Sequence, residues 1–406
     1  MPNNGIPVSG IAVRRPFVYN TDMKHRTFLA LPAVIALFLA LTPGLAWAAV
    51  SVTDFGAKGD GTTDDTAAFQ RAIDFIAERG GGKITVPYSP HGYRIASPGH
   101  ETWKDRACRA QICIPAQKRL NIAFEGEMPC KLLYAYIVRQ KGDRLGITRF
   151  GKRGMPNTCL FSDWAPPAVT NAAERPWSIL AAAEGNSCAG KFGASLVSIA
   201  NLEFRVKLDK EKMYPTGSAV NLQNASRVNV RDSQFCLDDS VGDSVIGKEL
   251  QPNPCHTVGL MTSGDQNDNQ VLDNVAAQGF RYGFVFGEHT VANYLYVHNC
   301  EEAIVFHDST HLSMINHVVA QHNGIILATT RTELFGHRKG ICNVIVGGID
   351  YEHGKNTLPL VSRMKYGVYD PENRFRGSVT HHLGWPGDGR SFFPILGGKN
   401  LSCRGL

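Results

Sequence analysis

Acidic, imidazole and guanidinium side chains recur at one phase of a sequence repeat in the second half of the chain. They precede a series of short apolar stretches, and the residues are Asp238, Asp239, His256, Arg281, Tyr282, Glu301, Glu302 and His322. If the apolar stretches are strands that stack in register, residues at the same phase become neighbours in space. Hydrolysis of a glycosidic bond needs a protonated carboxyl group, a carboxylate that activates water and a group that orients the sugar. This phase of the repeat supplies all three.

The residue types assign a role to each position of such a site. We predict that Asp238 and Asp239 act as acid and base and that His256 orients the sugar. The predicted substrate-binding residues are Arg281, Tyr282, Glu301 and Glu302. The turns of a stacked repeat face water and are polar for that reason alone, so a solvated face without catalytic function is the alternative interpretation.

A second chemistry fits the residues at this phase of the repeat. Cleavage of a uronate polymer by β-elimination needs a base at C5 and neutralisation of the carboxylate, and Arg281, Tyr282 and His256 are candidates for both tasks. No resident metal or other cofactor is expected for hydrolysis. If calcium neutralises the carboxylate in a lyase, its candidate ligands are Asp238, Asp239 and Asp243.

The elements that position these residues form a repeat. Gly259, Gly283, Ala303 and Gly324 each begin a small-then-apolar stretch, and their starts are 24, 20 and 21 residues apart. This spacing is typical of one turn of a solenoid. Further apolar stretches run in step with them, at 271–275, 294–297 and 314–318. Each turn is therefore predicted to contribute at least two short strands, stacked in parallel about 4.8 Å apart.

A strand, a glycine-rich turn and a helix precede the repeats. Residues 54–61 read Asp-Phe-Gly-Ala-Lys-Gly-Asp-Gly, and apolar residues then recur at helical spacing as far as the glycines at 80–82. Thr63 or Asp64 is placed to cap the helix, and Asp65 is predicted in its first turn. Lys-Ile-Thr-Val-Pro at 83–87 is predicted to be a strand.

This N-terminal order resembles the signature of the pectate lyase superfamily. The matching residues are Asp-Phe-Gly-Ala-Lys-Gly-Asp-Gly, Asp-Asp-Thr-Ala-Ala and Gly-Gly-Gly-Lys-Ile-Thr-Val-Pro, all within 54–87. The resemblance implies a single right-handed parallel β-helix of the pectin lyase-like fold, which acts on a polysaccharide. It also implies that the helix is an N-terminal cap, because a terminal repeat would otherwise leave the core open.

A partial resemblance to the polygalacturonase family of glycoside hydrolases appears further along. Asp238 and Asp239 match the Asp-Asp pair of that family, and His256 matches the histidine of its Gly-His-Gly motif without the flanking glycines. The family's Asn-Thr-Asp motif is replaced here by Tyr-Pro-Thr at 214–216, which has no acid. Its Arg-Ile-Lys motif falls near the apolar residues 284–286, with Arg281 close by. The missing acid puts the inverting hydrolase mechanism in doubt.

The chain begins with segments that are not expected in the folded domain. Residues 1–22 are interpreted as a mis-assigned upstream start. Residues 23–48 combine a basic segment, an apolar run at 28–41 and Ala-Trp-Ala at 46–48, which is the pattern of a Sec-type signal peptide cleaved after Ala48. The apolar run is short for a membrane span, although an N-terminal anchor is the alternative. The protein is therefore expected in the periplasm or secreted, without stable membrane insertion.

The remaining residues, 49–406, are predicted to form one β-helix domain. Within it, 49–87 is the N-terminal cap, about 195–355 forms the regular rungs and 356–406 covers the C-terminal end. The formal net charge is +6, of which residues 1–48 contribute four cations against one anion, so about +3 remains. This balance excludes nucleic acid as an expected partner. The basic segment at 139–154 is either a solvated loop or a surface that attracts an acidic polymer.

All ten cysteines follow the predicted cleavage site, an arrangement typical of disulfides in an exported protein. The first pairings to consider are Cys108 with Cys113, Cys159 with Cys188, and Cys236 with Cys255. The sequence thus predicts an exported carbohydrate-active enzyme that cleaves a polysaccharide backbone, as a glycoside hydrolase. A polysaccharide lyase acting on an acidic, uronate polymer and a non-catalytic polysaccharide-binding or surface protein are the alternatives.

Overall fold

The computed structural model describes the chain between residues 48 and 405 with gaps. The described residues are 48–130, 137–140, 144–147, 157–171, 174–185, 194–209, 214–238, 253–262, 269–306, 311–321, 323, 325–329, 342–352, 368–369, 377–381 and 401–405. Residues 1–47, which hold the predicted upstream segment and almost all of the predicted signal peptide, lie outside them. Within the described ranges no helix has the length and hydropathy needed to cross a membrane.

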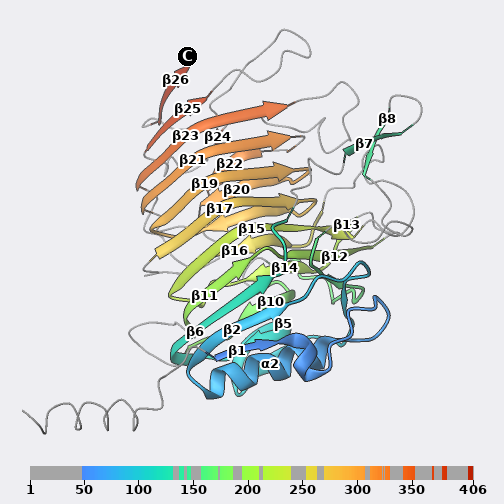
Figure 1. Cartoon of the computed structure of the whole chain (residues 1–406). Coiled ribbons are helices and arrows are strands. Elements are labelled where there is room, and N and C mark those ends of the chain that lie inside the picture. The colour runs from blue at the N-terminus through green and yellow to red at the C-terminus, as the bar shows by residue number, and fades with distance from the viewer. Residues whose placement is uncertain are drawn as a thin grey trace, which may run out of the picture. The chain divides into compact units, whose positions relative to one another are not determined.

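A helix closes the N-terminal end of the core. β1 (Ala48–Ser51) and a short 3-10 helix, η1 (Val52–Phe55), lead through the glycine-rich turn to α2 (Thr66–Glu78). Phe69, Ile73 and Ile76 are fully buried along one face of α2, so the apolar stripe read from the sequence is confirmed. Figure 1 shows α2 lying across the end of the strand stack. The predicted capping role of the helix is therefore confirmed.

Asp64 and Asp65, which precede α2, make different hydrogen bonds, and only Asp64 has the role predicted for it. The Asp64 carboxylate accepts a hydrogen bond from the Thr66 amide at 3.1 Å, as predicted for a capping residue. Asp65 is the N-cap residue and makes no side-chain cap bond, so its predicted place in the first turn is wrong. Its carboxylate accepts instead from the amides of Lys58 (2.7 Å) and Gly59 (3.1 Å), because the glycine-rich turn curls back over it.

Two large, mainly parallel sheets form the body of the described chain. Sheet A has the order β1-β2-β6-β11-β15-β17-β19-β21-β23-β25-β26, and its further strands are β2 (Gly81–Val86), β6 (Gln117–Gly126), β11 (Ala194–Ala200), β15 (Arg227–Asp238), β17 (Asn269–Gln278), β19 (Thr290–His298), β21 (His311–Gln321), β23 (Cys342–Glu352), β25 (Gly377–His381) and β26 (Leu401–Gly405). Sheet B has the order β24-β22-β20-β18-β16-β14-β10-β5-β4, with β4 (His100–Trp103), β5 (Arg106–Ile114), β10 (Ser178–Ala182), β14 (Ser218–Asn221), β16 (Val258–Met261), β18 (Tyr282–Phe286), β20 (Glu302–Phe306), β22 (Ile325–Thr329) and β24 (Val368–Tyr369).

Shorter strands extend sheet A. They are β3 (Tyr93–Ile95), β9 (Cys159–Ser162), β12 (Glu203–Asp209) and β13 (Tyr214–Pro215). A separate antiparallel hairpin is formed by β7 (Ile137–Gln140) and β8 (Arg144–Ile147), within the basic segment 139–154 and just before it. The segment 156–192, in which the sequence shows no clear period, contributes β9 to sheet A and β10 to sheet B. Strand stacking therefore starts before residue 195, where the sequence repeat becomes regular.

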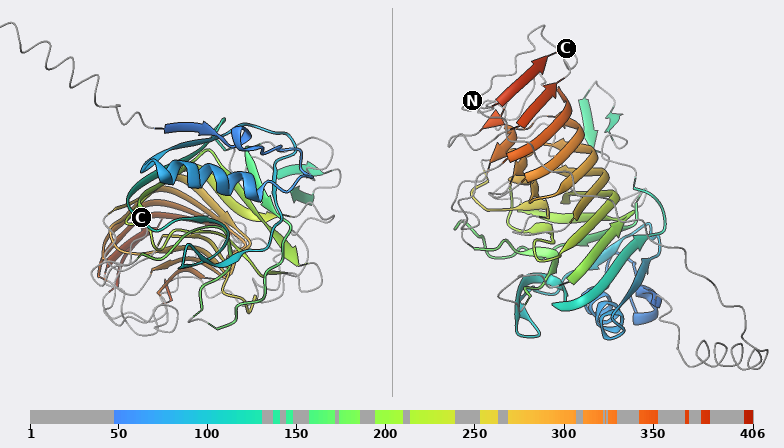
Figure 2. Two further views of the ribbon diagram at one scale, coloured as in Figure 1. Left: turned by 90° about the horizontal axis from the view of Figure 1, so that it is seen from below. Right: turned by 90° about the vertical axis from the view of Figure 1, so that its left-hand side faces the viewer.

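The chain alternates between the two sheets, turn after turn. From β16 to β22 every even-numbered strand belongs to sheet B and every odd-numbered strand to sheet A. Neighbours in each sheet pair in parallel, so Tyr282 lies opposite Glu302 in sheet B and Leu295 lies opposite Val318 in sheet A. Figures 1 and 2 show this winding along the stack. The architecture is the predicted right-handed parallel β-helix.

The long strands of sheet A are bent. Asp232 in β15 and Asn274 in β17 take positive φ values of 46° and 54°, and Asn274 Nδ2 donates to Asp232 Oδ1 at 2.7 Å. Asn201, between β11 and β12, has a φ of 60°. Asparagine and aspartate tolerate this left-handed conformation better than other non-glycine residues. Each bend divides a long strand into two straight parts, so a turn presents two faces from sheet A and one from sheet B.

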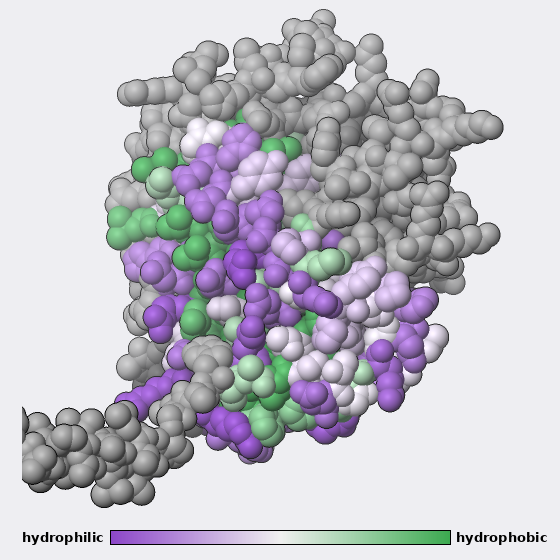
Figure 3. All heavy atoms as spheres, viewed as in Figure 1, coloured by the Kyte–Doolittle hydropathy of each residue, from purple (hydrophilic) through white to green (hydrophobic). Residues whose placement is uncertain are grey.

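The two sheets differ in their outward faces. Residues of β17 alternate between exposed and buried over its first half, whereas all five residues of β18 are buried. On the outer face of sheet A, Val271, Val291, Met314 and Ile345 form an exposed apolar column across four paired strands. Figure 3 shows hydrophobic and hydrophilic residues side by side on this view of the molecule. Around these turns sheet A therefore behaves as a half-buried sheet and sheet B as a buried one, whereas the edge strand β4 of sheet B is mostly exposed.

One of the three suggested cysteine pairings is confirmed. Cys108 and Cys113 form a disulfide at the two halves of β5. The pairing of Cys236 with Cys255 is wrong: the buried Cys236 thiol donates to Glu203 Oε1 at 3.4 Å, and burial raises its pKa well above the usual value. Cys188 lies outside the described residues, so its pairing with Cys159 stays a prediction.

Candidate functional site

The predicted site residues that the structure describes lie at one corner of the β-helix, where the chain passes from sheet A into sheet B. We call His256, Arg281, Tyr282, Glu301 and Glu302 the corner column. The Tyr282 amide donates to the Thr257 carbonyl oxygen and the Glu302 amide donates to the Arg281 carbonyl oxygen, each at 2.9 Å. These ladder bonds join three successive turns. Tyr282 pairs with Glu302, so Arg281–Tyr282 and Glu301–Glu302 stack as predicted. Val258 is the residue that pairs with Tyr282, so Thr257, and not His256, lies level with Arg281. The predicted phase is one residue out at His256.

His256 is buried, with 8% of its surface exposed. Its Nε2 lies 3.0 Å from the Thr170 carbonyl oxygen and its Nδ1 lies 3.0 Å from the Tyr282 hydroxyl. A carbonyl oxygen only accepts, so Nε2 carries a proton, and in the neutral imidazole Nδ1 accepts from Tyr282. Burial and the nearby Arg281 charge lower the pKa of His256. The ring is thus held as a neutral group with both nitrogens bonded to protein atoms, and the predicted role of His256 in orienting a sugar stays a prediction.

Arg281 and Glu301 are partly exposed, with side chains 25% and 23% exposed, and Glu302 is partly exposed as well. Arg281 Nη1 donates to the Pro254 carbonyl oxygen at 3.1 Å, and the guanidinium carbon lies 5.3 Å from the centre of the Tyr282 ring. Arg281 Nε lies 3.8 Å from Glu301 Oε2. The guanidinium is therefore fixed by protein contacts while part of it faces outward.

The backbone of Asp238, one member of the predicted acid–base pair, reaches the same corner. Asp238 is the last residue of β15 and pairs with Lys207 of β12. Leu237 lies against Gly279, since a Cβ added there would be 2.4 Å from Leu237 Cδ1. Gly279 stands two residues before Arg281. The side chain of Asp238 and all of Asp239 and Asp243 lie outside the described residues.

Three residues that the sequence interpretation missed complete the corner. The backbone amide of Asn253 donates to Glu301 Oε1, and its side-chain Nδ2 donates to Thr257 Oγ1 at 2.9 Å. Thr170 supplies the carbonyl oxygen that holds His256. Thr257 lies at the phase of Arg281 but carries no charge, Asn253 lies just before that phase, and Thr170 lies in a segment without a period. Only the order Asn-Pro-Cys-His-Thr, a turn-forming start followed by a strand, marked this stretch.

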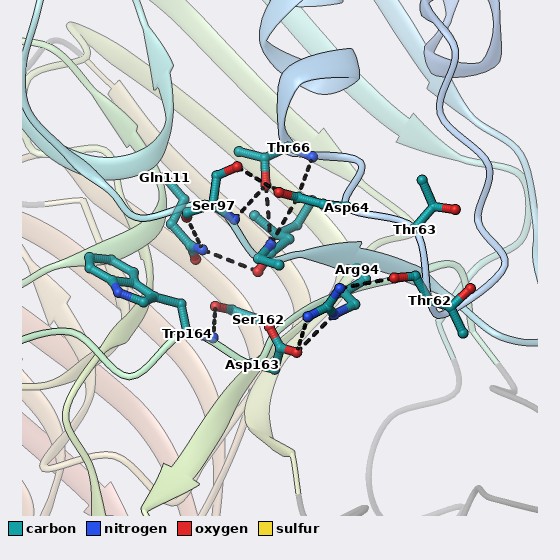
Figure 4. A network of polar contacts seen from close by, with 12 residues as sticks. Thr62, Thr63, Asp64, Thr66, Arg94, Ser97, Gln111, Ser162, Asp163 and Trp164 are labelled. Atoms are coloured by element: carbon teal, nitrogen blue, oxygen red, sulfur yellow. Dashed lines mark hydrogen bonds and ion pairs between the residues drawn. The ribbon is translucent and has the colours of Figure 1, made fainter.

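The loop that carries Thr170 is anchored at its start by a polar network. Asp163 accepts from Arg94 Nε at 2.8 Å, and Arg94 Nη1 donates to the Thr62 carbonyl oxygen at 2.9 Å. Figure 4 shows this network between the cap and β9, with Trp164 beside it. Trp164 packs edge to face on the buried Trp177, with ring centres 5.3 Å apart.

A buried ion pair lies in the neighbouring part of sheet A. Glu203 and Arg205, on one face of β12, are buried and bonded to each other, and Asn157 Nδ2 donates to Glu203 Oε2 at 2.7 Å. The strand alternation places these charges opposite the core residues Phe204 and Val206.

Among the described residues, no group of three or more histidine, cysteine or acidic side chains is arranged to hold a metal ion. The calcium ligands suggested for a lyase lie outside that range, apart from the Asp238 backbone.

Comparison with known proteins places the strongest similarity at the N-terminus. Residues 49–99 match the family model described as rhamnogalacturonase A/epimerase, pectate lyase-like. Alginate lyase 7 of Azotobacter vinelandii is 53% identical over 83 residues, which are 20% of this chain and 9% of that protein. Mannuronan C5-epimerase AlgE6 of the same organism is 47% identical over 49 residues, 12% of this chain and 5% of that protein. The matches thus span less than a tenth of the length of these relatives.

Solved structures are similar at lower identity. DFA-IIIase from Arthrobacter chlorophenolicus A6 has a TM-score of 0.45 and 9% identity, over 83% of this chain and 74% of that chain. An exopolygalacturonase from Thermotoga maritima has a TM-score of 0.34 and 12% identity, over 82% and 87%. Together with the family match at residues 49–99, the strand pairing described above confirms the predicted resemblance to the pectate lyase superfamily.

Proposed function

We propose that the protein is an exported carbohydrate-active enzyme that cleaves the backbone of a polysaccharide at the corner column. The observation that carries the proposal is the Arg281 guanidinium, held by Pro254 and Tyr282 and partly exposed beside Glu301. A cation fixed in this way loses little side-chain conformational entropy when it binds an anionic or hydroxyl-rich ligand. The N-terminal similarity to polysaccharide-acting proteins supports the substrate class.

Elimination from an acidic polymer is the chemistry that the described side chains support best. Arg281 would neutralise the carboxylate of a uronate, which makes the C5 proton more acidic. The Tyr282 hydroxyl would pass its proton to His256 Nδ1 and take the C5 proton in its place, because His256 Nδ1 is its acceptor. The electrons of the C5–H bond then form the C4–C5 double bond as the C4–O bond breaks, and the leaving oxygen takes the proton back from the Tyr282–His256 pair. The names alginate lyase and mannuronan C5-epimerase both denote action on uronate polymers, which supports this choice.

Hydrolysis is the second candidate, and a specific feature favours it. β15 ends at the same corner with Asp238, its penultimate residue Leu237 packs against Gly279, and Asp239 is the next residue in the sequence. Two carboxyl groups at this place would supply the acid and the base of a glycoside hydrolase. In that case Asp239→Asn abolishes cleavage without unfolding the protein.

One assay separates the candidates. The protein is incubated with alginate, polygalacturonate and neutral polysaccharides while reducing ends and absorbance near 235 nm are followed. We expect both signals to rise on an acidic polymer, because elimination leaves an unsaturated uronate. Reducing ends without absorbance indicate hydrolysis, and binding without either signal would support a non-catalytic binder and contradict the proposal. A chelator arm tests calcium: activity that survives chelation assigns carboxylate neutralisation to Arg281.

The matched variants are Arg281→Ala and Arg227→Ala. Removing a fixed guanidinium that bonds to the substrate is expected to lower kcat/KM about 100-fold. Arg227 lies on the exposed face of β15, and its variant is expected to keep wild-type activity. Equal activity of both variants would remove Arg281 from the site.

The proposed export is checked separately by sequencing the N-terminus of the mature protein, which is expected to begin at Ala49.

A further inference from the structure

The segment 253–257 holds Arg281 and Glu301 in a fixed relation. Thr257 Oγ1 accepts from Asn253 Nδ2 at 2.9 Å and from the Arg281 amide at 3.1 Å. The Asn253 amide donates to Glu301 Oε1. One buried hydroxyl oxygen therefore ties the Arg281 backbone to the residue that positions the Glu301 carboxylate.

The resulting ion pair is incomplete. Arg281 Nε is enclosed by protein and has no hydrogen-bond partner among the described residues, and its 3.8 Å distance to Glu301 Oε2 exceeds that of a hydrogen bond. A guanidinium and a carboxylate left free to move would close to a shorter, often bidentate contact. Asn253 holds Glu301 Oε1 and Thr257 Oγ1 holds the Arg281 backbone amide, so both partners are tied to the segment 253–257. The part of the Arg281 guanidinium that faces outward belongs to a side chain that is 25% exposed and stays outside a closed ion pair.

The Thr257 hydroxyl is not needed for the strand ladder. The backbone of Thr257 makes its own bonds, to the Cys255 carbonyl oxygen and from the Tyr282 amide, each at 2.9 Å. Asn253 Nδ2 also donates to the Pro215 carbonyl oxygen at 3.3 Å, and Asn253 Oδ1 accepts from the Cys255 amide at 2.9 Å. The turn is thus held without Thr257 Oγ1. Across the turns, this oxygen accepts the Arg281 backbone amide, so its role is to position Arg281.

We propose that Thr257 is a positioning residue that, braced by Asn253, sets the separation of Arg281 from Glu301 and so keeps Arg281 available to a carboxylate on the polysaccharide. The inference rests on the proposed function, because it assigns the donor capacity of Arg281 to that substrate. It adds that the affinity for an acidic polymer depends on a buried hydroxyl that never touches the sugar. Without this hydroxyl, Glu301 closes on Arg281 and competes with the substrate.

The test compares Thr257→Val, which removes the hydroxyl at nearly constant volume, with Thr257→Ser, which keeps it. For a carboxylate-bearing polysaccharide we expect Val to raise KM about tenfold with kcat changed less than threefold, and Ser to stay within twofold of wild type. For the methyl-esterified polymer the Val effect is expected to vanish, since no carboxylate competes with Glu301. A purely structural role would lower activity on both polymers equally and would overturn the proposal.

Two further measurements keep the proposal separate from the proposed function. Hydrogen exchange at the Arg281 amide, followed by mass spectrometry, is expected to be faster in Thr257→Val than in Thr257→Ser, because the amide loses its acceptor. Binding of an oligouronate, measured by calorimetry, is expected to weaken about tenfold in the Val variant. A wild-type protein that binds this ligand but cleaves no polymer refutes the cleavage, while equal binding by both variants refutes the role of Thr257.

A second variant covers the case in which Thr257→Val does not fold. Asn253→Ala leaves Thr257 intact but removes the brace on its hydroxyl, and it is expected to raise KM on the acidic polymer in the same direction. Thermal melting of each variant identifies any loss that comes from unfolding. A folded Asn253→Ala protein with wild-type KM on both polymers would contradict the inference.

Discussion

At the scale of the residue, environment decides what a side chain can do. The sequence placed His256 beside acids and cations, as a group that orients a sugar. In the structure its two nitrogens bind Thr170 and Tyr282, and it is almost fully buried. The outward chemistry of the corner column then passes to Arg281 and Glu301. A histidine that is locked in one tautomer by a carbonyl oxygen is suited to accept a proton from Tyr282 and poorly suited to titrate at neutral pH.

The stability of the protein is predicted to report this neutral state. Because the folded pKa of His256 is lowered, the unfolded chain binds its proton first, and stability falls as the pH drops below the unfolded value near 6.5. His256→Gln loses the ring contacts and is expected to be about 1–2 kcal/mol less stable than wild type at pH 7.5. This difference in stability between the two proteins should shrink at pH 5, because only the wild type has a histidine here whose protonation favours the unfolded state. Urea unfolding at both pH values checks it, and a gap that widens at pH 5 would contradict the assignment.

At the scale of the element, the N-terminal cap depends on a few carboxylates that satisfy backbone amides. Asp64 accepts from the Thr66 and Ala96 amides and from the Ser97 hydroxyl, and so joins the start of α2 to the chain after β3. Burial raises the pKa of Asp64, but these hydrogen bonds outweigh it and lower the value to about 2. An acid that holds two segments together is more than a helix cap, because its loss frees both.

Replacing Asp64 is therefore predicted to loosen the cap. Asp64→Ala is expected to cost about 1–2 kcal/mol of unfolding free energy, the upper part of the range for a lost N-cap. The contribution of the carboxylate is present above its unfolded pKa of 3.8 and is lost as the pH falls through about 2. Asp60, whose carboxylate bonds only to Thr62 and Thr63 of its own turn, is the matched control. Unfolding curves in which Asp60→Ala loses as much as Asp64→Ala would refute the special role of Asp64.

At the scale of the whole molecule, the parallel stack makes each turn dependent on the turns beside it. Gly259 and Gly283 begin consecutive strands of sheet B, and a Cβ on Gly283 would lie 2.6 Å from the Ala303 carbonyl oxygen and 2.7 Å from Val297 Cγ1. The small residues that mark the sequence repeat thus stand where adjacent turns approach most closely. A side chain there pushes on the next turn, which carries Glu301 and Glu302.

Gly283→Val is predicted to damage both stability and the corner column. Overpacking at this contact is expected to cost about 3 kcal/mol or more, since backbone atoms of the next turn must move. Asp273→Val, on the exposed face of β17, is the control and is expected to change stability by less than about 0.5 kcal/mol. Thermal melting and the polysaccharide assay together check the prediction. A Gly283→Val protein with wild-type melting and activity would show that the stack has room at this point.

The sequence by itself determined the architecture, and the phase of the corner to within one residue. Glycine or alanine at the start of each strand, at intervals of 20 to 24 residues, is enough to predict stacking, because a parallel stack repeats one local geometry. The helical stripe of α2 and the Cys108–Cys113 disulfide followed from local spacing in the same way.

Only the tertiary structure decided which corner residues face outward and what holds them. Thr170 is 86 residues from His256, and Asn253 is 48 residues from Glu301, in segments whose composition carries no chemical signal. Thr170 lies in the loop after β9 and Asn253 lies shortly before β16, and no local pattern encodes either long-range contact. Periodicity fixes neighbours one turn apart, whereas loop packing and burial fix protonation, exposure and the distance between Arg281 and Glu301.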